Sequence, residues 1–234
     1  SKRNVDNEVL VFKSRRLMTE VARNLHLDVS YTVKDGLRTV ELYTQSPVQL
    51  SFPDAEEAQA FSLKAVPVSG KEVVLSGFTL GGREVADGKP VKVALNDTVT
   101  TPVGRVVVVP SLYYGDKYFN TVVQVTKSPL QDVALRFQGG LQATLANKAS
   151  TIINLTLQDV SIPRAEDVIN TLISVYNTDA INDKNQIVMN TSNFINDRLI
   201  VIEKELGDVD SDIESYKREH QLTDISSETG MYLQ

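Results

Sequence analysis

The chain has 234 residues, of which 41% are hydrophobic, and its formal net charge at pH 7 is −6. This length and apolar content suffice for a sizeable core in one large domain or two small ones, whereas the scattered basic residues lack the positive patch that nucleic-acid binding needs. The absence of cysteine excludes disulfides, thiolate zinc sites and thiol nucleophiles, and it is compatible with the cytosol or the bacterial periplasm.

No apolar run approaches the roughly 18–20 residues that a membrane-spanning helix requires. The chain begins at Ser1 and carries neither a secretory signal nor a presequence. We therefore expect it to have been cut from a longer protein.

The first predicted element is a helix from Asn7 to Leu27. Its apolar residues recur at helical spacing, and they are Leu10, Leu17, Val21 and Leu25. Basic residues lie between them, at Lys13, Arg15, Arg16 and Arg23. A solvated helix face is the favoured interpretation of these cations, with contact to anionic lipid headgroups as the alternative.

After Asp28 the sequence becomes rich in β-branched and aromatic runs separated by Gly, Pro and Asn, which is typical of strands. The predicted strands are Val29 to Val33, Leu37 to Thr44, Val48 to Phe52, Phe61 to Val68, Val73 to Leu80, Val91 to Leu95, Arg105 to Val109 and Phe119 to Lys127. Short turn sequences connect them, as antiparallel neighbours need. We expect a mostly antiparallel sheet.

The rest of the chain, from Pro129 onward, is predicted to be mainly helical. We expect a helix from Pro129 to Asn147, weakened by two glycines, and then one more buried strand from Ile152 to Leu157. Pro163 begins a helix that would run roughly 90 Å if continuous to about Leu222, although the Asn-rich section 177–196 is a plausible place for a break. The predicted fold class is α+β, with a base domain at 1–162 and a coiled-coil segment at 163–234 that ends before its returning helix.

One stretch of the last segment allows two interpretations. Asp208, Asp210, Asp212 and Glu219 stand at positions 1, 3, 5 and 12 of a calcium-binding EF-hand loop. The sharp turn of that loop needs glycine at position 6, where this chain has Ile213. The turn chemistry is therefore absent, and we predict no metal site.

The competing interpretation is a coiled coil. Apolar residues alternate at spacings of four and three, which is an unbroken 3.5-residue period. These residues, called the seam below, are Ile195, Leu199, Ile202, Leu206, Val209, Ile213 and Tyr216. Glu214 and Arg218 would form a favourable i,i+4 pair on the same helix. A seam of this length cannot bury itself, so we expect it to pack against another helix.

Several stretches resemble the chain-length determinant family of bacterial polysaccharide co-polymerases. They are Val125-Thr-Lys-Ser-Pro129, the predicted helix from Asp132 to Leu145, the strand Ile152 to Leu157, the helix start Pro163 to Tyr176, and the coil from Phe194 to Lys217. The segment from Val9 to Tyr31 and the run Thr101-Pro-Val-Gly-Arg105 are similar to the exopolysaccharide and capsule members, which are often joined to a cytoplasmic tyrosine autokinase.

The resemblance implies a periplasmic domain of an inner-membrane protein. Members have an α/β base, a long helix and two flanking membrane spans absent from this chain, and they assemble as homo-oligomers that govern polysaccharide length. The implied partners are the polymerase and export machinery and the polysaccharide itself. The resemblance places no catalytic residue and no cofactor in this chain, and a kinase domain would lie in the parent protein.

A cluster of aromatic residues is a candidate sugar contact. Tyr113, Tyr114 and Tyr118 surround a Gly-Asp-Lys turn, where exposed rings could stack on sugars and their hydroxyls could form hydrogen bonds. Cross-strand packing is the more common role of aromatic residues in hairpins.

Two other classes of function remain open. A periplasmic adaptor of an efflux or secretion pump would also combine strands with a coiled hairpin, but it should carry lipoyl-like half-motifs that this sequence lacks. An enzyme would need a polar cluster in the strand-rich half, and neither of the two histidines, His26 and His220, stands in an evident catalytic motif.

Overall fold

The computed structural model describes the backbone of residues 2–231 and the side chains of residues 5–220. The chain divides into two units, Ser1–Asn177 and Thr178–Gln234. The first unit therefore extends beyond the expected boundary at residue 162. The reason is that Val168 and Leu172, in the first turns of the long helix, are fully buried in its core.

The first unit combines antiparallel sheets with helices, in agreement with the predicted α+β class. The strands are β1 (Val29–Asp35), β2 (Arg38–Glu41), β3 (Val48–Ser51), β4 (Phe61–Pro67), β5 (Glu72–Leu80), β6 (Arg83–Glu84), β7 (Val91–Ala94), β8 (Thr98–Thr101), β9 (Gly104–Pro110), β10 (Val123–Lys127), β11 (Leu141–Leu145) and β12 (Ile153–Leu157). The largest sheet has the order β2-β1-β10-β4-β5-β6, with β7 also paired to β5. A second sheet has the order β3-β9-β8, and β11 pairs with β12.

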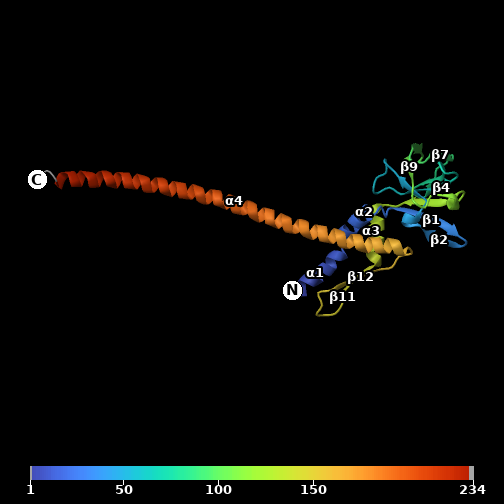
Figure 1. Cartoon of the computed structure of the whole chain (residues 1–234), viewed down its shortest axis with the longest axis horizontal. Coiled ribbons are helices and arrows are strands. Elements are labelled where there is room, and N and C mark those ends of the chain that lie inside the picture. Colours follow the sequence, from blue (N-terminus) through green and yellow to red (C-terminus); the bar gives the residue numbers. More distant parts are fainter. Residues whose placement is uncertain (1, 232–234) are drawn as a thin grey trace. The chain divides into compact units, whose positions relative to one another are not determined.

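The first unit holds two apolar clusters. One lies between the two larger sheets and includes Leu63, Val73 and Val106, which are fully buried. The other joins the helices α1 (Lys2–Phe12), α2 (Arg15–Asn24) and α3 (Leu130–Gly140) to the start of α4 (Ile162–Met231), and Figure 1 shows α2 and α3 near these first turns. Two short 3-10 helices, Tyr43–Gln45 and Asp116–Tyr118, lie in the connections.

The prediction of one helix from Asn7 to Leu27 was wrong. The structure has two helices, because Ser14 is extended (φ −69°, ψ 142°) and its side chain accepts a hydrogen bond from the Leu17 N–H at 3.3 Å. Serine is a preferred N-cap residue. The cap therefore begins a new helix inside a continuous helical pattern.

The predicted helix from Pro129 to Asn147 was also too long. Helix α3 ends at Gly140, and Leu141 begins strand β11, in which buried Leu141 and Ala143 alternate with exposed neighbours. Strand β12 pairs with β11 in an antiparallel register that runs from Leu141↔Leu157 to Leu145↔Ile153. This strand is only half-buried, contrary to expectation, because it belongs to a sheet of two strands.

The strand-rich region differs from prediction mainly at strand ends. The run expected to continue to Thr44 stops at Glu41 and turns into the 3-10 helix Tyr43–Gln45, and the run expected from Phe119 begins at Val123. Strand β8 was not predicted, although Thr98-Val-Thr-Thr101 is β-branched throughout.

The long helix is continuous through residues 177–196, so the break considered there is absent from the described backbone. Asparagine and aspartate each cost a helix less than about 0.7 kcal/mol relative to alanine. No proline follows Pro163. The Asn-rich composition alone therefore does not end the helix.

Candidate functional site

The seam residues all lie on helix α4 in the second unit. Their exposed fractions range from 39% for Ile202 to 61% for Tyr216 in the isolated chain. Their spacing of four and three residues places them along one face of a helix with 3.6 residues per turn. This face is a continuous apolar surface that the described part of the second unit does not cover.

The same face continues toward the N-terminus of the second unit. Ile181 and Val188 precede Ile195 by fourteen and seven residues, and their exposed fractions are 59% and 65%. This extension is hard to see in the sequence because Asn185 and Ser192 occupy the intervening heptad positions. The only signal of the extension in the sequence is the interval of seven residues between Ile181, Val188 and Ile195.

A second apolar stripe runs beside the seam and was not predicted. Ile187, Phe194 and Val201 are also spaced by seven residues, and their exposed fractions are 64%, 70% and 43%. They lie roughly 100° around the helix from the seam at 3.6 residues per turn. An apolar surface of this width exceeds what one partner helix covers in a simple two-stranded coil.

The acidic residues considered for calcium lie inside α4. Residues 208–219 are helical throughout, so the bent loop of an EF-hand is not formed. The predicted pair of Glu214 and Arg218 is present, with 3.9 Å between Oε2 and Nη2. Within the described residues, no three acidic or histidine side chains are grouped as metal ligands.

The three tyrosines near the Gly115 turn have different environments. The Tyr114 hydroxyl donates to the Ser69 carbonyl at 2.6 Å, and its ring packs edge-on against Phe119. Tyr113 is 50% exposed, and the Lys117 ammonium lies 5.4 Å from the centroid of the Tyr118 ring. Tyr114 is thus tied into the base, which leaves Tyr113 and Tyr118 to carry the predicted sugar contact.

A buried polar cluster fixes the first turn of α4 to the base. Arg164, only 7% exposed, donates to both carboxylate oxygens of Asp159 at 2.6 Å and forms an ion pair with Glu41. The guanidinium also lies 5.3 Å from the centroid of the Phe137 ring. Such bidentate geometry suits arginine and not lysine.

Burial raises the pKa of the Glu41 carboxyl, while the Arg164 guanidinium opposes that shift. In the sequence, Arg164 stands out only as part of a helix start. Its partner Glu41 is 123 residues away, so no local pattern connects the two.

Two further contacts hold the same part of α4. The Tyr43 hydroxyl donates a hydrogen bond to the Asp167 carboxylate at 2.8 Å. Burial raises the pKa of the Tyr43 phenol, and the hydrogen bond to Asp167 raises it further. The rings of Phe12 and Tyr176 stack with centroids 4.3 Å apart. The first four turns of α4 are thus anchored by charge, hydrogen bonding and ring packing.

None of the helices formed by the described residues combines the length and the apolar character of a membrane span. Neither models of known protein families nor curated proteins match the chain when the sequences are compared.

Proposed function

We propose that this chain is a periplasmic domain of a bacterial inner-membrane polysaccharide co-polymerase, which regulates the length of a capsular polysaccharide or exopolysaccharide. The domain acts by assembly and not by catalysis. The first unit is the base, and the second supplies a helix that packs against helices of other subunits. The partners are further copies of the chain and the machinery that polymerises and exports the polysaccharide.

The observation that carries this proposal is the uncovered seam on α4. Burial of apolar surface stabilises association by roughly 25 cal/mol per Å² before the costs of ordering. A solvated helix that served only as a spacer would be polar on all sides. The seam and the stripe at Ile187, Phe194 and Val201 instead favour a helix that is covered on more than one side.

The identity of the seam residues also bears on the number of helices. The spacing places Leu199, Leu206 and Ile213 at heptad position a, and Ile195, Ile202 and Val209 at position d. In parallel coiled coils, leucine at a with isoleucine at d favours three or four strands over two. This preference supports an assembly larger than a dimer.

The polysaccharide assignment itself depends on the family resemblance described above. A periplasmic adaptor or scaffold of an efflux or secretion assembly would use the same helix surface. The two functions differ in what is lost with the gene: polymer length in one case, resistance or secretion in the other.

The test is the length distribution of surface polysaccharide in the native host after deletion of the gene. Complementation with wild type should restore the distribution, whereas Leu206→Asp should not, because it places a charge in the seam. Ser211→Asp is the matched control, since it adds the same charge roughly 160° around the helix from Ile195.

An unchanged length distribution in the deletion strain would refute the polysaccharide assignment. Loss of drug efflux or secretion in that strain would favour the adaptor. If Leu206→Asp and Ser211→Asp restored polymer length equally well, the seam would not be the working surface.

A further inference from the structure

A cavity of the first unit lies where the start of β1 meets the end of β10. It has a volume of about 510 Å³ and is bounded by the connection from α2 to β1, by strands β1 and β10, and by the segment 43–57. Pockets for small molecules commonly measure roughly 300–1,000 Å³. Its size therefore admits a small ligand.

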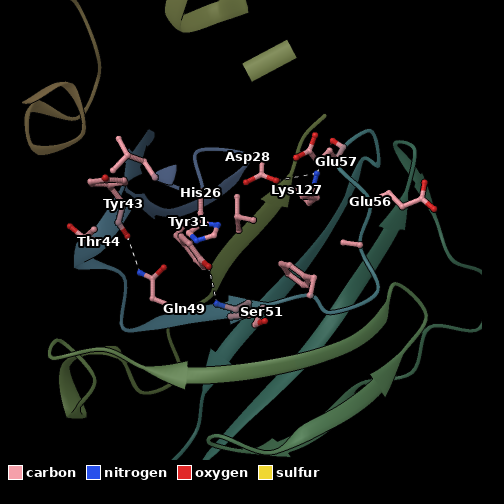
Figure 2. A pocket seen from close by; sticks show the side chains of 15 residues that line it. His26, Asp28, Tyr31, Tyr43, Thr44, Gln49, Ser51, Glu56, Glu57 and Lys127 are labelled. Atoms are coloured by element: carbon pink, nitrogen blue, oxygen red, sulfur yellow. Dashed lines mark hydrogen bonds and ion pairs between the residues drawn. The ribbon is translucent and has the colours of Figure 1, made fainter. Parts of the chain in front are cut away.

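The wall combines aromatic rings with both charged and uncharged hydrogen-bonding groups. Figure 2 shows His26 beside Tyr31, the Asp28–Lys127 pair toward one end of the cavity, and Gln49 and Ser51 toward the other. The Tyr31 hydroxyl accepts the Leu50 N–H at 2.8 Å, and no hydrogen bond found among the described residues uses its own proton. The His26 imidazole is likewise unused in the described hydrogen bonds, and it lies on a residue held at φ 51°.

Gln49 keeps further hydrogen-bonding capacity. One of its amide protons is donated to the Tyr43 carbonyl at 3.3 Å. A glutamine amide offers two donors and one acceptor oxygen. The side-chain oxygen and the second proton are therefore available to a ligand, next to the exposed hydroxyl of Ser51.

The charge of the wall selects against anions. The lining includes three carboxylates, on Asp28, Glu56 and Glu57, and one cationic side chain, Lys127. The Lys127 ammonium lies 3.3 Å from Asp28 and also donates to the carbonyls of Glu57, Gln59 and Ser128. The Lys127 side chain is 4% exposed, and these contacts already compensate its charge. An acidic ligand would meet net negative charge without a free cation.

The wall is held in place before any ligand arrives. Phe52 packs edge-on against Phe61 with ring centroids 4.9 Å apart, and the Asp54 carboxylate accepts bonds from the backbone and side chain of Arg105. At the other end of the segment, Glu57 pairs with Arg23 on α2 at 2.7 Å. A wall fixed at several points loses little entropy on binding.

We propose that this cavity binds an uncharged saccharide unit, with an apolar sugar face against Phe52 or Tyr31 and hydroxyls bonded to His26, Gln49 and Ser51. Sugars combine these two kinds of surface, and aromatic rings beside amide, hydroxyl and imidazole groups match both. The inference rests on the proposed function, because it gives the length regulator a direct contact with its polymer. It also places that contact beside Tyr43, whose hydroxyl reaches α4 through Asp167.

The test is a titration of the purified full chain, followed by amide ¹H–¹⁵N spectra. The probes are glucose, galactose and N-acetylglucosamine, with glucuronate and galacturonate as the acidic counterparts of the first two. Each is added up to about 50 mM, which would saturate a site with a Kd of about 1 mM. At least one neutral sugar should shift the amides of His26, Gln49 and Ser51. For a hexose that binds, its acidic counterpart should bind several-fold more weakly.

Two variants separate the cavity from the rest of the surface. Ser51→Trp should fill the cavity and weaken binding at least tenfold, whereas Thr100→Trp, at an exposed position of the same β3-β9-β8 sheet, should leave it unchanged. Gln49→Ala should weaken binding about fivefold and keep the wild-type melting temperature. These variants keep the test valid if one substitution disturbs folding.

The inference is overturned if none of the three neutral sugars shifts the cavity amides, if Ser51→Trp binds like wild type, or if an acidic sugar binds more tightly than its neutral counterpart. Its failure is separable from that of the proposed function. A chain that binds no sugar but still sets polymer length through Leu206 would refute the cavity site alone. A chain that binds sugar without affecting polymer length would refute only the regulatory role.

Discussion

The two units of the chain differ in how far their large apolar side chains are buried. In the first unit, Leu63, Leu75 and Leu172 are fully buried. All buried side-chain polar atoms of the described residues also have hydrogen-bond partners. In the second unit, every large apolar residue described between positions 178 and 220 is at least 39% exposed. The first unit therefore has an apolar core of its own, whereas we expect the helix of the second unit to gain tertiary stabilisation only from a partner.

The largest expected change in stability comes from an aspartate placed in the core of the first unit, compared with an aspartate placed on the helix of the second unit. Leu172→Asp puts a carboxylate into the core of the first unit and should cost about 4 kcal/mol or more, enough to unfold a marginal domain. Leu206→Asp in the monomeric chain should leave the unfolding transition of the first unit unchanged, because Leu206 is 57% exposed. Thermal unfolding monitored by near-ultraviolet circular dichroism distinguishes the two. Equal losses of stability would contradict the division.

The next effect concerns the polar cluster at the start of α4. Arg164→Met should cost roughly 3–5 kcal/mol, because it leaves the carboxylates of Glu41 and Asp159 buried without their cation. The double variant with Glu41→Gln should be less damaged, since one of these charges is then absent. Urea unfolding at pH 7 measures both. If Arg164→Met were as stable as wild type, the polar cluster would not hold the start of α4.

The pH dependence of this cluster has a defined sign. Burial raises the pKa of Glu41 above its ordinary value, so its contribution to stability is fully present below about pH 4.3 and is lost as the pH rises through the folded pKa. Removing the Arg164 cation strengthens this shift. The destabilisation by Arg164→Met should therefore be smaller at pH 4 than at pH 7 in paired urea titrations. A larger loss at pH 4 would contradict this assignment.

A smaller effect is expected within α4. Gly207 has open space where a Cβ would stand, and it follows Leu206 on the side away from the seam. Gly207→Ala should therefore stabilise the helix by about 1 kcal/mol without altering the seam. Hydrogen exchange of amides 203–211 measures the change, and Ser211→Gly should shift the same amides in the opposite direction. Faster exchange in Gly207→Ala would show that the glycine has another role.

The smallest effect tests the wall of the cavity. Bonds from Arg105 lower the pKa of the Asp54 carboxyl to about 2. A depressed pKa gives a contribution to stability that is present above about pH 3.9 and lost as the pH falls through the folded value. An NMR titration of the Asp54 carboxyl carbon should show this low midpoint, and Arg105→Gln should return it toward 3.9. An ordinary midpoint in wild type would mean that the wall is not anchored there.

Strands and the long helix could be predicted because their signals are local. Strands β4, β5 and β9 lie within two residues of the expected ranges, and α4 begins at Ile162, one residue before the expected start. The failures occur where a short-range cue overrides a longer pattern. Ser14 caps a new helix within a helical period, and the glycines at 139–140 allow the chain to change from helix to strand.

The candidate sites divide in the same way. The seam could be predicted because its residues follow one another on a single helix, so spacing alone places them on one face. The Arg164 cluster and the cavity could not, because their members come from distant parts of the chain. Lys127 and Glu57, for example, are 70 residues apart and meet only because β10 pairs with β4.

The sequence by itself determined the local periods: a strand-rich first part, a long helix that starts near residue 163, and an apolar repeat of seven residues along that helix. Only the tertiary structure decided the strand order β2-β1-β10-β4-β5-β6, the burial of Arg164 beside Glu41, and the cavity beneath the segment 43–57. The physical reason is that backbone conformation follows from neighbouring residues. The pairing of distant strands depends instead on the packing of the whole core.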